Sequence, residues 1–126
     1  MKHFIAALCI LAVIITACAV SMSSLHRTCG DVMALLDQAE LAADRREHER
    51  AATHFASAMK RWDDKEWLFA ILLRHSERDA VTLQLAAAHE YLRSGELTEY
   101  RAANAEVVTQ LEHIQKMENL NWNNLL

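Results

Sequence analysis

The chain carries no Asp, Glu, Lys or Arg between Lys2 and Arg27, and this uncharged stretch constrains the fold more than any other feature. Residues 4–20 read FIAALCILAVIITACAV and lack the polar stripe that a buried core helix of a globular protein shows. A membrane-spanning helix needs about 20 apolar residues, and the stretch reaches that length when it extends to residues 22–25. We therefore predict a transmembrane or signal-anchor segment over residues 1–23 and a separate domain over residues 24–126.

The orientation of this segment depends on very few charges. Lys2 and the α-amino group precede it, and positive charge before a span is usually retained in the cytoplasm. Arg27 follows closely and opposes that preference. We expect a single-pass protein of the cytoplasmic membrane with a cytoplasmic N-terminus and an extracytoplasmic domain.

Three fates of the segment are compatible with its residues. It stays as a signal anchor, or it is cleaved beside the small residues Ala17 and Ala19, or it is a lipoprotein signal. The third fate follows from residues 15–18, Ile-Thr-Ala-Cys, which fit the lipobox in which the thiol of Cys18 takes the lipid. The simpler interpretation is that Cys18 is a small packing residue in a membrane helix.

Composition excludes several classes of protein for the remaining residues. The chain has no Pro and two Gly, which disfavours an all-β fold, a Rossmann unit and a P-loop. A net charge of -4 argues against nucleic-acid binding. Only Cys29 lies beyond the apolar segment, so we expect no disulfide framework. The preferred interpretation of Cys29 is a semi-buried free thiol, and pairing between two chains is the alternative.

Apolar residues recur at helical spacing throughout residues 24–126, which predicts an all-α domain. We expect an antiparallel bundle of about four helices, built as two αα-hairpins because the connections are short. The predicted first stripe is Leu25, Cys29, Val32, Leu36, Ala39 and Ala43, and residues 44–47 form a turn. The second is Ala52, Phe55, Ala56, Met59 and Trp62, continuing over residues 66–75. The third is Val81, Leu85, Ala88 and Leu92, and the fourth is Leu97, Tyr100, Asn104, Val107, Leu111, Ile114 and Glu118.

The helix ends are predicted from local signals. Residues 63–65, Asp-Asp-Lys, either interrupt the second helix or form its exposed face. Ser76 is a plausible N-cap for the third helix, and Gly95 fits a left-handed residue that ends it. The Asn-rich residues 119–126 are expected to end the fourth helix.

No motif in the chain indicates a reaction, a metal or a cofactor. His89-Glu90 resembles the start of a zinc helix, but the second His that the motif requires is replaced by Arg93. His75 and Asp79 are four residues apart, so on a helix they are placed to hydrogen-bond, with His75 half-buried. Such a pair suits proton transfer, although a core histidine that ties two helices together is the favoured interpretation. We expect no enzyme activity, no cofactor and no metal site.

The aromatic residues are interpreted by their positions. Trp62 lies on the apolar stripe and is expected in the core, and Trp67 lies at its edge. Trp122 is expected either to cap the bundle or to contact the membrane interface.

After the apolar N-terminal span, one set of residues forms a recognisable layout: Trp62, Trp67, Leu72, His75, Glu77, Asp79, Tyr91, Leu92 and the closing run Asn124-Leu125-Leu126. This layout resembles a family of short membrane-anchored proteins of Gram-positive bacteria that is catalogued as a domain of unknown function. Arg78, Ala80 and Trp122 depart from the pattern. The resemblance implies membrane placement and a helical architecture, and it implies no reaction, cofactor or ligand.

Three functions are compatible with these observations. The preferred one is an interaction module that is anchored in the bilayer and binds a membrane protein or a second copy. The next is a small-ligand or peptide binder with a groove lined by Trp67, His75 and Tyr91. The least favoured is an enzyme that uses His75 with Asp79 or Glu77.

Overall fold

The computed structural model describes residues 1–125, with the side chains of all of them except 118, 121, 122 and 125. The described chain contains five helices and no strand: α1 (Lys2–Asp44), α2 (His48–Asp63), α3 (Glu66–Leu72), α4 (His75–Ser94) and α5 (Leu97–Leu125). The predicted all-α fold is therefore confirmed.

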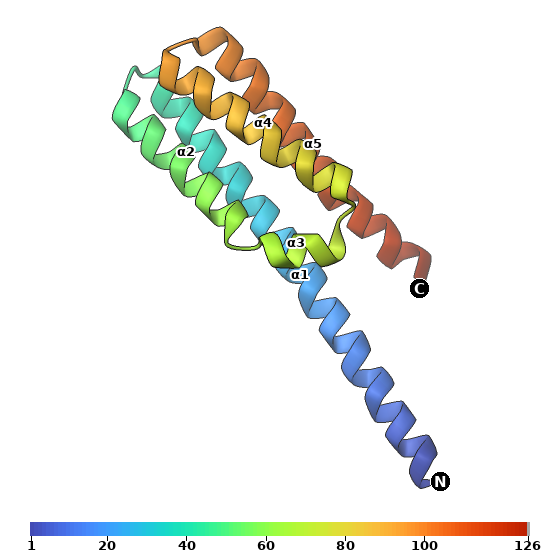
Figure 1. The fold of residues 1–126 in the computed structure, drawn as a ribbon. Coiled ribbons are helices and arrows are strands. Elements are labelled where there is room, and N and C mark those ends of the chain that lie inside the picture. Colours follow the sequence, from blue (N-terminus) through green and yellow to red (C-terminus); the bar gives the residue numbers. More distant parts are fainter. Residues whose placement is uncertain (126) are drawn as a thin grey trace.

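Helix α1 is the longest element and has two different surroundings. Its first half projects alone from the molecule, and its second half packs inside the bundle (Figure 1). The helix continues without a break through residues 23 and 24, where the boundary between the two predicted regions lies. That boundary stays a prediction, and burial inside the bundle begins at Leu25.

The bundle consists of two antiparallel hairpins, α1 with α2 and α4 with α5, as predicted (Figure 1). The short helix α3 joins them at the end of the bundle where α1 leaves it. Both hairpin turns contain a residue in the left-handed region, Arg46 at φ 60° and Gly95 at φ 79°. The amide of Glu96 donates to the carbonyl of Tyr91 at 3.0 Å, and that of Glu47 donates to the carbonyl of Ala42 at 2.9 Å. These bonds satisfy carbonyls at the helix ends, as in a Schellman motif.

The predicted stripes of the first, third and fourth helices are buried. All six positions of the first stripe and all four of the third lie in the core, and so does the fourth from Tyr100 to Ile114. The side chain of Glu118, the last position of that stripe, lies outside the described residues.

The stripe predicted for the second helix is correct at Phe55 and Trp62 and wrong at Ala52 and Ala56. Ala51 and Ala58 are buried in place of Ala52 and Ala56, which are exposed. The alanines of this helix are equally apolar, so the hydrophobic pattern does not distinguish its faces. The large rings of Phe55 and Trp62 set the rotation of the helix, and both are fully buried.

Trp62 is a core residue, as predicted, and it joins three helices. Its ring stacks on that of Phe69 in α3 with a centroid distance of 4.2 Å. Its indole N–H donates to the hydroxyl of Thr82 in α4 at 3.2 Å. Trp62 therefore links the α1–α2 hairpin to α3 and to α4, the first helix of the second hairpin.

Two predicted helix ends are wrong. The break before α4 falls at Leu73 and Arg74, whose backbones are extended, so Arg74 and not Ser76 is the N-cap. Helix α5 continues through the Asn-rich residues to Leu125. Asn lowers helix propensity by less than ~1 kcal/mol per residue, and residues 97–125 contain no Gly or Pro to stop the helix. Residues 63–65 do interrupt the second helix, since α2 ends at Asp63 and α3 begins at Glu66.

Candidate functional site

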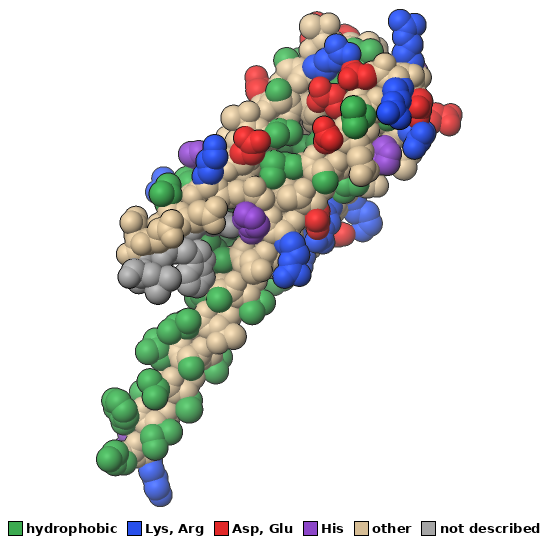
Figure 2. Space-filling model, turned by 180° about the vertical axis from the view of Figure 1, so that it is seen from behind, with side chains coloured by type: hydrophobic (Ala, Val, Ile, Leu, Met, Phe, Trp, Pro, Cys, Tyr) green, Lys and Arg blue, Asp and Glu red, His purple; other side chains and the backbone are tan. Residues whose placement is uncertain are grey.

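The first half of α1 is apolar on all sides and fully exposed. An 18-residue window in it has a mean hydropathy of 2.7, and none of that window is buried in the protein. Figure 2 shows apolar side chains along this projecting segment, while the charged side chains gather on the bundle. By length and composition the segment is able to cross a membrane, and a signal sequence has the same properties.

The hydroxyl group within this segment is satisfied by its own helix. Thr16 donates to the carbonyl of Ala12 at 2.8 Å. A hydroxyl without such a partner is costly in hydrocarbon, where water is absent. The segment is therefore suited to an apolar surrounding at its one hydroxyl residue between Phe4 and Val20.

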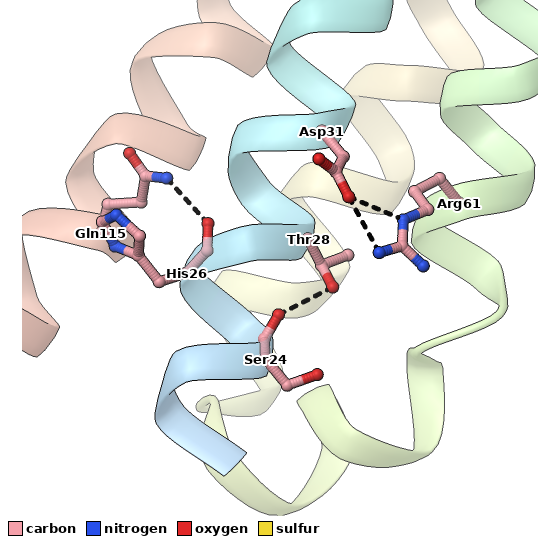
Figure 3. A network of polar contacts seen from close by, with 6 residues as sticks. All are labelled: Ser24, His26, Thr28, Asp31, Arg61 and Gln115. Atoms are coloured by element: carbon pink, nitrogen blue, oxygen red, sulfur yellow. Dashed lines mark hydrogen bonds and ion pairs between the residues drawn. The ribbon is translucent and has the colours of Figure 1, made fainter. Parts of the chain in front are cut away.

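Helix α1 is braced from two sides where its apolar half ends (Figure 3). From α2, Arg61 donates through Nε and Nη2 to Oδ2 of Asp31, at 3.1 and 2.8 Å. From α5, Gln115 donates through Nε2 to the carbonyl of His26 at 3.0 Å. These contacts join residues 30 and 89 positions apart in the chain, so no local pattern predicted them.

A hollow of about 510 Å³ lies beside α1 at this same level. We call it the junction hollow; its lining residues are Ala19, Val20, Ser23, Ser24, Arg27, Arg61 and Lys65. Two residues come from the apolar half of α1, and three carry positive charge. Within the described chain, Arg27 and Lys65 have no carboxylate partner, while Arg61 is paired with Asp31. The junction hollow is therefore apolar on the side of the projecting segment and cationic on the side of the bundle.

Helix α3 lies at the same end of the bundle (Figure 1). It exposes large apolar side chains. Trp67 is 63% exposed and Ile71 is 73% exposed. The prediction that Trp67 lies at the edge of the core is confirmed. The side chain of Trp122, which was expected to cap the bundle or contact the membrane interface, lies outside the described residues.

The residues that carry the family resemblance do not form one site. His75 is the first residue of α4 and is exposed, so the prediction that it is half-buried is wrong. Its Nδ1 lies 2.8 Å from Nη2 of Arg78, which in turn lies 3.6 Å from a carboxylate oxygen of Asp79. Arg78 therefore contacts both His75 and Asp79. The chain bends before His75, which removes His75 from the preceding stripe and exposes it.

The other residues of the resemblance are separated along the molecule. Glu77 is half-buried near the start of α4, and Asn124 is exposed near the end of α5. Tyr91 lies sixteen residues after His75 on α4, which is about 24 Å at 1.5 Å per residue. The predicted groove of Trp67, His75 and Tyr91 is therefore wrong, because these residues lie at different ends of the bundle.

A second hollow lies between the two hairpins, at the end of the bundle away from the projecting half of α1. It measures about 380 Å³ and lies between α2 and α4; its lining residues are His48, Glu49, Ala52, His89, Leu92, Arg93, Ser94 and Gly95. The ring of His89 stacks on that of Phe55 at 5.8 Å. Arg93 pairs with Glu90 at 2.8 Å, and this hydrogen-bonded cation lowers the pKa of the Glu90 carboxyl. Among the described residues no three His, Cys, Asp or Glu side chains are grouped to hold a metal ion.

A polar cluster that the sequence did not predict lies between α1 and α5. Asn104 is buried and donates to a carboxylate oxygen of Glu40 at 2.6 Å. The hydroxyl of Tyr100 is buried without a hydrogen-bond partner in the described part of the chain. Its burial raises the pKa of the phenol, and the carboxylates of Glu40 and Asp44 raise it further. Both residues were predicted in the core from their spacing, and their polar surroundings were not.

The cysteines differ in exposure. Cys18 is exposed in the apolar half of α1, and Cys29 is buried in the bundle. The semi-buried thiol predicted for Cys29 is thus fully enclosed. Lipidation of Cys18 stays a prediction.

Comparison with protein families gives a match over most of the chain. The model of a family described as "Domain of unknown function (DUF4363)" matches residues 19–125. The matched region begins near the end of the apolar half of α1 and includes the whole bundle. No curated protein and no solved structure matches the chain.

Proposed function

Since the chain belongs to the DUF4363 family, whose description names no activity, we propose its function from the geometry: a membrane-anchored helical interaction module at the outer face of the cytoplasmic membrane. Its partner is a membrane protein, and self-association is the alternative. The observation that carries this proposal is the continuity of α1 from an exposed apolar half into the core of the bundle. The proposal assigns no reaction to the chain.

The apolar half of α1 supplies the anchor. About 20 residues of helix cross the hydrocarbon layer of roughly 30 Å, and residues 3–22 have that length without a charged side chain. The bundle begins at Leu25 on the same helix, with no linker between. A bundle held in this way stays at a fixed height over the bilayer, where the exposed parts of other membrane proteins lie.

The charge before the apolar half supports this orientation. Lys2 favours a cytoplasmic start of the helix, which would put the bundle outside, and Arg27 behind the apolar half opposes that preference. Lipidation at Cys18 is the alternative anchor. In that case the residues before Cys18 are removed, and the lipid holds the bundle at the same surface.

The surface that we propose for the partner is an uncharged face on α2 and α4. Neither helix has an Asp, Glu, Lys or Arg over residues 51–59 and 80–89, although 24% of the chain is charged. We call this the uncharged face; its exposed residues are Ala52, Thr53, Ala56, Ser57, Thr82, Leu83, Ala86 and Ala87. Leu83 is 71% exposed. Small side chains allow a helix of the partner to approach the backbone closely.

The test is co-purification of the full-length tagged chain from detergent-solubilised native membranes after mild crosslinking. Ala86→Arg places a charge on the uncharged face, and Ala105→Arg is the matched control, because Ala105 is also an exposed helical alanine and lies on α5. We expect the wild type and Ala105→Arg to retain one stoichiometric membrane protein and Ala86→Arg to lose it. Recovery of the wild type alone would overturn the proposal, and recovery of a crosslinked dimer would establish the self-association alternative.

The hollow between the hairpins favours a second candidate function, the binding of a small ligand or peptide. It contains two imidazoles, from His48 and His89, and the cation of Arg93. Arg93 is engaged by Glu90, which reduces its availability to an anionic ligand. A ligand screen by thermal shift, with His89→Ala as the variant that removes the response, tests this function.

A further inference from the structure

The junction hollow combines features that a lipid headgroup requires. We propose that it binds the phosphate of an anionic phospholipid, with Arg27 and Lys65 contacting the phosphate and Ala19 and Val20 contacting the start of the acyl chains. This inference rests on the proposed membrane anchor and goes beyond it, because it assigns a ligand class to a defined site.

The charge of the hollow supports an anionic ligand. Arg27, Arg61 and Lys65 supply three positive charges, and the carboxylate of Asp31 compensates one of them through its two contacts with Arg61. A guanidinium has five N–H donors, so Arg61 retains three after those contacts. The nearby carboxylate of Asp64 is paired with Lys60 at 3.1 Å and does not neutralise the hollow. Two net positive charges therefore remain for a ligand.

The depth of the hollow matches the headgroup layer. If the hydrocarbon layer ends near Met22, Arg27 lies about 7.5 Å beyond it at 1.5 Å per residue. The headgroup layer on each side of a bilayer is roughly 5–8 Å thick. Ser23 and Ser24 then lie inside this layer, and the long side chain of Arg27 reaches back into it.

The lining chemistry favours a lipid over a free phosphate ion. A phosphodiester accepts hydrogen bonds and donates none, and the polar lining offers guanidinium, ammonium and hydroxyl donors. The apolar residues Ala19 and Val20 lie in the same hollow, and a free ion gains nothing from them. Helix α3 follows Lys65 directly, and its exposed Trp67 is of the type that lies at the level of the headgroups.

The test uses the full-length chain in a non-ionic detergent with equal amounts of phosphatidylglycerol and phosphatidylcholine that carry the same acyl chains. Native mass spectrometry counts the lipid that remains bound. The variant Arg27→Gln/Lys65→Gln removes the two unpaired cations and leaves the bracing contact of Arg61 intact. The matched control is Arg74→Gln/Lys116→Gln, which makes the same charge change at exposed positions outside the hollow.

We expect the wild type and the control to retain more phosphatidylglycerol than phosphatidylcholine. In the hollow variant the ratio of the two retained lipids should fall roughly tenfold to thirtyfold, since each cation near a lipid surface contributes about a factor of five. No preference in the wild type, or equal losses in both variants, would overturn the proposal. Inorganic phosphate is added as a competitor. Unchanged lipid retention supports the lipid assignment, and displacement of the lipid overturns it in favour of a phosphate-ion site.

A separate measurement distinguishes failure of this inference from failure of the anchor. Alkaline carbonate extraction of native membranes shows whether the chain is embedded in the bilayer. A chain that resists extraction but shows no headgroup preference keeps its anchor and lacks the proposed lipid site. A chain that is extracted has no anchor, and the proposed function then fails with the lipid site.

Discussion

The two halves of α1 belong to one helix and present opposite surfaces. In the first half, apolar side chains on every side are exposed, from Leu11 at 52% to Phe4 at 70%. In the second half, one stripe is apolar and almost completely buried, with Leu25 at 1% and Leu36 at 0%. The difference shows that apolar content alone does not place a helix. The angular distribution of apolar residues indicates whether its neighbours are lipid or protein.

The bundle half of α1 also makes polar contacts with other helices. Asp31 is held by Arg61 and the His26 carbonyl by Gln115, where two other helices meet α1 (Figure 3). In the apolar half, the hydroxyl of Thr16 bonds within its own helix. Stability of the bundle and placement in the membrane are therefore expected to depend on different residues of the same helix.

The largest effect is expected from Leu36→Ala, which removes a fully buried side chain. It should lower the free energy of unfolding by about 2–5 kcal/mol, because both the transfer energy and a cavity contribute. Urea unfolding of the full chain in mild detergent, followed by tryptophan fluorescence, measures this. Leu11→Ala is the control and should change the value by less than about 0.5 kcal/mol. Equal losses in the two variants would show that the halves are not independent.

Val13→Arg should disrupt the first half alone. An arginine at the centre of a span costs about 2.5–3.5 kcal/mol in membrane insertion. We expect the fraction of chain that resists carbonate extraction to fall, with Val13→Leu as the unaffected control. The unfolding curve of the bundle should stay unchanged. Full retention of Val13→Arg in the membrane would contradict a spanning role for this half.

The two glycines should respond to alanine with opposite signs. Gly30 is helical, and a Cβ there meets only Nε2 of Gln115 at 3.7 Å, an ordinary contact. Gly30→Ala should therefore raise the free energy of unfolding by about 0.5–1 kcal/mol. Gly95 has φ 79°, so Gly95→Ala should lower it by about 1–2 kcal/mol although no atom lies within 4 Å. The same urea assay checks both, and changes of equal sign would contradict these backbone assignments.

The smallest effect at neutral pH is expected from Tyr100→Phe, which changes the surface that packs against the second half of α1. The hydroxyl has no hydrogen-bond partner among the described residues, so its removal should change stability by less than about 0.5 kcal/mol.

The same variant should differ from the wild type in alkali. Burial raises the pKa of the Tyr100 phenol, so the folded chain keeps a proton that the unfolded chain loses near pH 10. This contribution is fully present below about pH 10 and is lost as the pH rises above it. Urea unfolding at stepwise higher pH should show a smaller loss for Tyr100→Phe than for the wild type. Tyr91→Phe retains Tyr100 and should behave like the wild type, and identical losses in all three chains would contradict the prediction.

The fold was predictable where large apolar residues recur along one face of a helix. This holds for α1 from Leu25 onward, for α4 and for α5 up to Ile114, and all three stripes were predicted correctly. It fails for α2, where Ala52 and Ala56 are as apolar as the buried Ala51 and Ala58. The prediction fails for His75 as well. The N-cap of α4 is Arg74, two residues before the predicted Ser76, and the break there removes His75 from the preceding stripe.

The candidate site was less predictable because its residues are distant in sequence. The junction hollow combines five residues of α1, from Ala19 to Arg27, with Arg61 and Lys65. Only the packing of α2 against α1 places them together. The pairing of Asp31 with Arg61 depends on the same packing. The buried surroundings of Tyr100 depend on the approach of α1 and α5. A helical stripe gives the position of a residue on its own helix and carries no information about which residue of another helix faces it.

The absence of a break in α1 has a mechanical consequence. Residues 23–44 extend about 33 Å beyond the apolar half at 1.5 Å per residue. Transmembrane helices tilt by about 20° on average and adjust that tilt to bilayer thickness. With the apolar half in a bilayer as proposed, a change in tilt of about 20° displaces the turn at residues 45–47 sideways by about 11 Å. The helix then acts as a lever arm that converts membrane thickness into lateral motion at its outer end.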